Sequence, residues 1–205
     1  KPVPTTGSID LVLSFDAPSG LTAATAQDDV DIAASIDILA GALDAVGIAI
    51  GEITYRDVTL SNSNLPLSQP DCNLDDSFAA VFDEAPAPSP DVVHVIFVQH
   101  FTCTKFGGAI DYGDNLAALS IGAPGTPFAT RSGILASTFA KPTYPVEWAE
   151  VLAHEVGHYL GLFHTRETSG GIVDNIADTA DDEAGAAANI MYFNVTLSTA
   201  TTLTP

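Results

Sequence analysis

Three spaced histidines in the C-terminal third of the chain constrain its fold more than any other feature. The stretch that begins at His154 reads HEVGHYLGLFH, so His158 and His164 follow within eleven residues. On a helix, positions four apart lie one turn above each other, so the first two imidazoles can bind one ion together. Gly161 can take the positive φ that ends a helix, which returns His164 as a third ligand. The pattern predicts a helix, a sharp turn and a metal site.

The ligand set predicts a catalytic zinc site. Three imidazoles around a tetrahedral zinc leave the fourth position open for water, which is typical of catalytic centres and not of structural ones. Glu155 lies next to the face that carries His154 and His158, where it can reach a water molecule on the metal. Zinc lowers the pKa of that water to about 7, and a glutamate can transfer its proton to a leaving amine. We therefore expect zinc-dependent hydrolysis of peptide bonds, with Glu155 activating the water.

Two other interpretations remain open at this level. The chain could be a catalytically silent, zinc-stabilised binding module of the same fold, although Glu155 argues against this because a structural site needs no general base. It could also be a latent enzyme in which the thiolate of Cys72 or Cys103 occupies the open zinc position. A disulfide between the two cysteines would forbid the latent form.

The stretch around the histidines resembles a known family. The chain has one methionine, Met191, within the run NIMYF after the third histidine, and the long histidine motif followed by a Met-turn is the metzincin signature. Residues 154–165, HEVGHYLGLFHT, resemble the active-site helix of the pappalysin-like branch. Residues 173–179, VDNIADT, are similar to the run before the Met-turn of that branch, and residues 117–125 resemble its cleft-lining edge strand.

This resemblance implies a two-lobed catalytic domain that spans residues 1–205. The upper lobe would be residues 1–161, including the active-site helix, and the lower lobe would be residues 162–205, with the Met-turn. The edge strand would bind substrate through Leu119, Ser120 and Ile121. Many relatives carry a Tyr two places after the methionine that can steady the reaction intermediate, whereas this chain has Phe193 there and Tyr192 one place earlier.

Hydrophobic periodicity predicts an α/β fold with a mostly parallel, twisted sheet, an antiparallel edge strand and a long active-site helix. The expected strands are 8–15, 48–58, 91–101, 117–122 and 133–137. The expected helices are 28–46, 75–84 and 146–162, and 61–71 is expected to be a loop. The two histidines outside the motif, His94 and His100, are interpreted as hydrogen-bonded core or rim residues.

Charge and cysteine content narrow the partners and the compartment. The chain has 6 Lys+Arg against 26 Asp+Glu, a formal net charge of −20, which argues against nucleic acid and anionic membranes as partners. We expect a disulfide between Cys72 and Cys103, which would stabilise the fold by roughly 3 to 4 kcal/mol. Such a bond is typical of secreted proteins, so we expect a secreted monomer that acts on peptide or protein substrates.

Carboxylates crowd the segment between the third histidine and the methionine. Asp174, Asp178, Asp181 and Asp182 lie within it, close to several other oxygen-bearing side chains. Calcium takes six to eight oxygen ligands, which such a loop can supply, and pappalysin-like relatives bind calcium near this position. The segment could instead be an acidic, solvated turn, because its spacing does not match an EF-hand loop. Calcium is therefore a second candidate cofactor, after zinc.

Overall fold

The structure is a computed structural model that describes residues 7–66, 76–105, 108–111, 118–120, 133–139, 141, 145–165 and 188–192. The elements in chain order are β1 (Gly7–Asp16), η1 (Ala17–Ser19), α1 (Ala23–Ala26), α2 (Val30–Asp44), β2 (Ile48–Val58), β3 (Asn64–Pro66), α3 (Asp76–Glu84), β4 (Val92–Val98), β5 (His100–Lys105), β6 (Gly108–Asp111), β7 (Ala118–Ser120), β8 (Ile134–Ser137) and α4 (Pro145–Tyr159). None of the helices in these residues is both long and apolar enough to cross a membrane.

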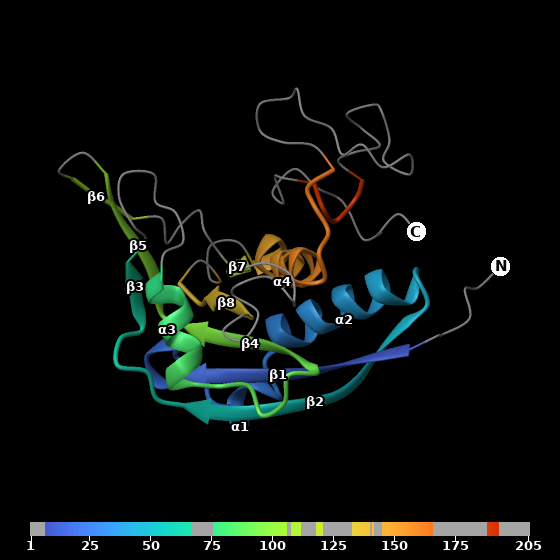
Figure 1. The fold of residues 1–205 in the computed structure, drawn as a ribbon, viewed down its shortest axis with the longest axis horizontal. Helices are drawn as coiled ribbons and strands as arrows, with labels where there is room; N and C mark the ends of the chain where they lie inside the picture. Colours follow the sequence, from blue (N-terminus) through green and yellow to red (C-terminus); the bar gives the residue numbers. More distant parts are fainter. Residues whose placement is uncertain are drawn as a thin grey trace.

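The central sheet has the order β2-β1-β4-β8-β7 (Figure 1). Strands β2, β1, β4 and β8 pair in parallel, while β7 pairs antiparallel with β8 at the edge. This confirms the predicted α/β fold with a mostly parallel sheet and an antiparallel edge strand. A second sheet, β3-β5-β6, extends from the carboxyl end of β4.

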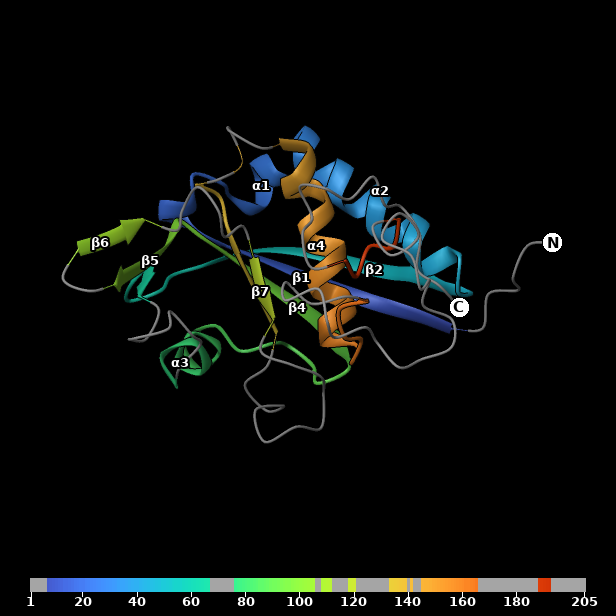
Figure 2. The ribbon, with the colours of Figure 1, turned by 90° about the horizontal axis from the view of Figure 1, so that it is seen from above.

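The two faces of the central sheet carry separate hydrophobic clusters. In β1, Leu11, Leu13 and Phe15 belong to the larger cluster, which is shared with α2 and α4. Successive strand residues point to opposite faces, so in β4 Val95 and Phe97 belong to the larger cluster, whereas Ile96 and Val98 belong to the smaller cluster with α3. Figure 2 shows α2 on one side of the sheet and α3 on the other, and residues of α4 pack in the same cluster as α2. Phe15 stacks on Phe97 with 4.8 Å between ring centroids, deep in the larger cluster.

Local signals explain where α2 begins and ends. The carboxylate of Asp29 caps the helix by accepting hydrogen bonds from the backbone N–H groups of Asp31 and Ile32, at 3.0 and 3.1 Å. Gly47 follows the helix with φ 79°, a conformation that favours glycine. The predicted helix 28–46 is confirmed with slightly tighter bounds.

One predicted strand is wrong in its extent. Residues 91–101 were expected to form a single strand, but β4 ends at Val98 and β5 begins at His100. The backbone N–H groups of Gln99 and His100 both donate to the carbonyl oxygen of Ser63, which turns the chain out of the first sheet. The chain then pairs with β3 instead, a nonlocal choice that the apolar run does not reveal.

The predicted loop 61–71 is also partly wrong. It contains the short strand β3, which pairs in parallel with β5 through Leu65 and Phe101. Strand β6, which pairs antiparallel with β5, was not predicted. Local propensity does not predict either strand, because the sequence around them is rich in proline and glycine. Both strands form through pairing with β5.

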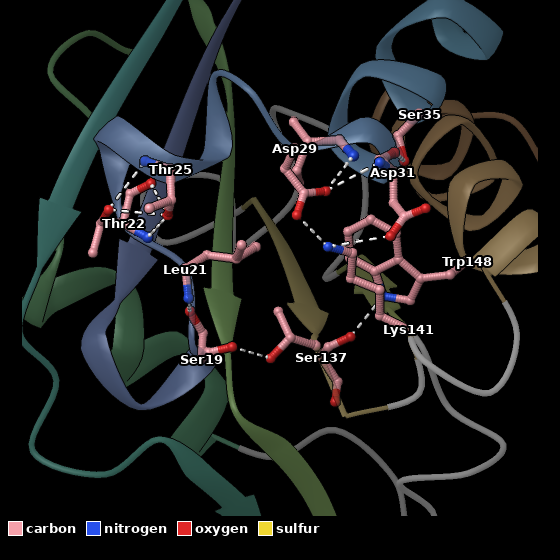
Figure 3. Close-up of polar contacts among 12 residues, drawn as sticks. Ser19, Leu21, Thr22, Thr25, Asp29, Asp31, Ser35, Ser137, Lys141 and Trp148 are labelled. Atoms are coloured by element: carbon pink, nitrogen blue, oxygen red, sulfur yellow. Dashed lines mark hydrogen bonds and ion pairs between the residues drawn. The ribbon is translucent and has the colours of Figure 1, made fainter.

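Lys141 joins the start of α2 to the segment before α4 (Figure 3). Its ammonium group contacts the carboxylate of Asp29, lies 3.2 Å from Oδ2 of Asp31, and lies 5.8 Å from the ring centroid of Trp148. The indole N–H of Trp148 donates to the carbonyl oxygen of Ser137 at 2.7 Å. These contacts hold the first turns of α4 against β8 and α2. They fix the N-terminal end of the helix that carries the histidine motif.

His94 is a buried, hydrogen-bonded core histidine, as predicted. Its Nε2 lies 2.7 Å from Oγ of Ser14 and 3.0 Å from Nη2 of Arg56. Arginine can only donate, so Nε2 is the acceptor in that contact and the ring proton resides on Nδ1. Arg56 also donates to Oγ of Ser14 at 2.7 Å, which closes a three-residue polar network under α3.

Acid should destabilise the fold through His94. Burial, and then the positive charge of Arg56, lowers the pKa of His94 from 6.5 to about 3. Below about pH 6.5 the unfolded chain gains a proton that the folded chain does not, so the free energy of unfolding falls by about 1.4 kcal/mol per pH unit. We expect the melting temperature of His94→Gln to fall less steeply than that of the wild type between about pH 6.5 and pH 4.5. If thermal melts show that the melting temperatures of both proteins fall equally with pH, His94 is not the source of the acid sensitivity.

Candidate metal centre

The helix that carries the motif ends where the sequence requires a turn. Helix α4 ends at Tyr159, three residues earlier than predicted, and Gly161 has φ 95°. The backbone N–H of Gly161 donates to the carbonyl oxygen of His158, and that of Leu162 donates to the carbonyl oxygen of Gly157, at 2.9 and 3.0 Å. These two bonds define a Schellman motif around a left-handed glycine. The predicted role of Gly161 is confirmed.

This turn brings the three histidines together. The candidate ligand atoms of His154, His158 and His164 all lie within 4.8 Å of one another. Nε2 of His164 lies 3.2 Å from Nε2 of His154 and 3.0 Å from Nε2 of His158. Nitrogen ligands bound to a tetrahedral zinc at 2.0–2.1 Å are separated by about 3.3 Å. Two of the three distances between the Nε2 atoms are therefore already close to those of a zinc site.

Backbone carbonyl groups fix the orientation of two imidazoles. Nδ1 of His154 lies 2.7 Å from the carbonyl oxygen of Ile190, and Nδ1 of His158 lies 2.8 Å from that of Leu162. A carbonyl only accepts, so each Nδ1 carries the ring proton and each Nε2 presents a lone pair to His164. The Nε2 atoms of all three rings therefore converge on one another. A cation at their centre would satisfy all three, and the donor set therefore fits zinc.

The protonation state of His154 suits metal binding. Its side chain is buried, with 4% exposed. Burial lowers the pKa of His154 to about 4, the hydrogen bond to Ile190 opposes this shift, and the neighbouring His158 and His164 add to it. The imidazole is thus neutral at neutral pH, which is the form that ligates a metal.

Glu155 lies beside the ligands and under the edge strand. Its side chain is 9% exposed, and burial raises its pKa to about 7, while a hydrogen bond from the backbone of Ser120 lowers it. A zinc dication nearby would favour the carboxylate form and oppose the effect of burial.

A tight turn at residues 188–192 packs against the segment that carries the three histidines. The backbone N–H of Met191 donates to Oδ1 of Asn189 at 2.9 Å, and that of Tyr192 donates to the carbonyl oxygen of Asn189. The carbonyl oxygen of Met191 accepts from the backbone N–H of Thr165, the residue after the third histidine. Met191 thus lies in direct contact with the metal-binding segment, although 27 positions separate it from His164.

Other predicted site residues are placed only in part. Leu119 and Ser120 lie in β7 at the sheet edge, while Ile121 and Phe193 lie outside the described residues. The acidic set proposed for calcium also lies outside them, and it comprises Asp174, Asp178, Asp181 and Asp182. Cys72 lies outside as well, and only the backbone of Cys103 is described, in β5. The disulfide and the calcium site therefore stay predictions.

Three features of the site were missed from sequence. The first is the pair of carbonyl groups, of Ile190 and Leu162, that orient two imidazoles. The second is the hydrogen bond between the backbone of Ser120 and the carboxylate of Glu155. The third is the close approach of Met191 to Gly157. Backbone groups leave no trace in the identity of a residue. The one available signal was Gly157, because glycine is an unfavourable choice inside a helix.

Comparison with known proteins supports the fold. No family model and no curated protein sequence matches the chain. Among solved structures, the crystal structure of metalloproteinase-II from Bacteroides fragilis is similar, with a TM-score of 0.54 and 15% sequence identity. The match covers 100% of this chain and 54% of that one, so the chain spans about half the length of the structure it resembles. The chain therefore shares the fold of that structure over its own length, and it contains a three-histidine group that could bind a metal.

Proposed function

We propose that this chain is the catalytic domain of a zinc-dependent endopeptidase. The observation that carries the proposal is the convergence of His154, His158 and His164 through their Nε2 atoms, with Glu155 next to them. Three neutral imidazoles that leave a fourth position open are the donor set of a catalytic zinc. The metalloproteinase fold supports the same conclusion.

Each residue of the site has a chemical task. Zinc, when bound, would polarise the scissile carbonyl and lower the pKa of water. Glu155 would accept a proton from the attacking water and donate it to the leaving amine, a role worth about 10² to 10⁴ in rate. The carbonyl groups of Ile190 and Leu162 would keep His154 and His158 in the ligating tautomer.

We further propose that the chain is a pappalysin-like metzincin. Its lobes would be residues 1–161 and 162–205, with Met191 in a Met-turn. The support is the motif resemblance together with the contact of the 188–192 turn with Thr165 and Gly157. Tyr192 is 3% exposed, so it lacks the open position expected of a residue that assists a substrate.

Substrate should bind to β7 as an added strand. In the described part of the sheet β7 has β8 on one side only, and an extended peptide can pair with such an edge. Leu119, Ser120 and Ile121 would contact the substrate, and the backbone N–H of Ser120, which already bonds Glu155, would not be among the pairing groups. A complex with an inhibitor bound away from this strand would refute the assignment.

The remaining proposals rest on sequence. A secreted, monomeric enzyme acting on peptides or proteins, with a Cys72–Cys103 disulfide, agrees with the cysteine count and the acidic composition. Two free thiols in a titration under non-reducing, denaturing conditions would remove the disulfide. We also propose that Asp174 and its acidic neighbours bind calcium. An unchanged melting temperature and activity after calcium chelation at saturating zinc would contradict this.

The alternative is a catalytically silent binding module of the same fold. A digest of a mixed peptide library by zinc-loaded protein, with and without a chelator, separates the two. We expect new peptide termini with zinc and none with the chelator. A folded, zinc-loaded protein that cleaves no peptide would favour the binding module.

A further inference from the structure

We propose that Gly157 is a positioning residue of the metal site: the absence of a side chain there lets Met191 pack against α4 and so places the carbonyl group that orients His154. This inference rests on the zinc site proposed above. It assigns a role to a position of the motif that carries no chemistry of its own.

The contact itself is close. A Cβ atom on Gly157 would lie 2.3 Å from Sδ and 3.2 Å from Cε of Met191, and 3.7 Å from Cδ1 of Leu162. Sδ would have to withdraw by about 1 Å to reach ordinary contact distance. The side chain of Met191 is only 2% exposed, so it can move only against its neighbours.

Helix geometry gives no other reason for glycine at this position. Gly157 lies inside α4, and positive φ is found instead at Gly161, where the helix has ended. A glycine inside a helix is less favourable than alanine, so a glycine here needs a packing reason. Gly41 in α2 provides the contrast, because a Cβ atom there would meet nothing within 4 Å.

The turn at residues 188–192 transmits the contact to the ligands. Ile190, the neighbour of Met191, provides the carbonyl oxygen that lies 2.7 Å from Nδ1 of His154. The carbonyl oxygen of Met191 accepts from the backbone N–H of Thr165, which adjoins His164. Hydrogen bonds to Asn189 close the turn, so a shift of Met191 would move both attachments together. Partners of this kind typically change metal affinity by about 10- to 100-fold.

The test compares Gly157→Ala with Gly41→Ala. We expect Gly157→Ala to weaken zinc binding by about 10- to 100-fold and to change the visible spectrum of the cobalt-substituted protein. Gly41→Ala should leave the zinc affinity and the spectrum unchanged. Equal zinc affinity and equal spectra in wild type and Gly157→Ala would overturn the inference, because Met191 would then simply have adopted another rotamer.

A second pair of variants decides the matter if Gly157→Ala fails to fold. Met191→Ala opens space beside position 157, so adding Gly157→Ala to Met191→Ala should cost no further zinc affinity. A further loss in the double variant would contradict the inference. These readouts need no turnover: a wild type that binds zinc but cleaves no peptide would defeat the proposed function and leave this inference standing.

Discussion

Replacement of Glu155 by glutamine is expected to lower kcat for peptide hydrolysis by about 10² to 10⁴, while the protein still binds zinc. Glutamine has nearly the same shape, and its side-chain oxygen can still accept from the backbone of Ser120, so the buried position is preserved. What it lacks is the capacity to take a proton from water. Initial rates on a cleavable peptide and the zinc content of the same samples measure both parts.

Glu150→Gln is the matched control for this prediction. Glu150 is a buried carboxyl group on the same helix, more than one turn before Glu155, and it is not placed among the ligands. Its substitution should change stability more than turnover. Full activity in Glu155→Gln, or loss of zinc from that variant, would contradict the role assigned to Glu155.

Replacement of His158 by alanine should weaken zinc binding more than the loss of a group that only orients a ligand. Loss of a direct ligand is expected to exceed the roughly 10- to 100-fold change in affinity that follows loss of a partner of a ligand. In the wild type, zinc at 100 times its dissociation constant should add about 2.7 kcal/mol to the free energy of unfolding. The variant should show almost none of this gain. Thermal melts over a series of zinc concentrations measure the difference.

His94→Gln is the control, because His94 is a buried imidazole in a separate polar network with Ser14 and Arg56. Its melting temperature should still rise with zinc as in the wild type. An equal zinc response of His158→Ala and wild type would show that the ion binds elsewhere.

The sequence allowed much of the site to be predicted because its chemistry is local. Spacing along α4 places His154 and His158 on one face, and Gly161 provides the positive φ that returns His164. The same applies to α2 and β2, whose periodicity lies within a single element. Where one helix and one turn determine the geometry, residue types suffice.

Nonlocal contacts set the limit. The break at Gln99 depends on hydrogen bonds to the carbonyl oxygen of Ser63, 36 positions away, and nothing in the apolar run marks it. The close approach of Met191 to Gly157 depends on how the 188–192 turn folds back onto α4. The Ser14, Arg56 and His94 network likewise joins three strands whose order must be known first. Pairing and packing decide these features, so propensity alone cannot predict them.

The most direct test of the central claim is a zinc titration of the metal-free protein, with bound zinc and the rate of peptide cleavage measured in the same samples. A single catalytic site made by His154, His158 and His164 predicts that the rate rises in proportion to bound zinc and that both level off together at one zinc per chain. Saturation with one tightly bound zinc and no cleavage of any peptide in a mixed library would contradict the claim, as would cleavage that persists without metal.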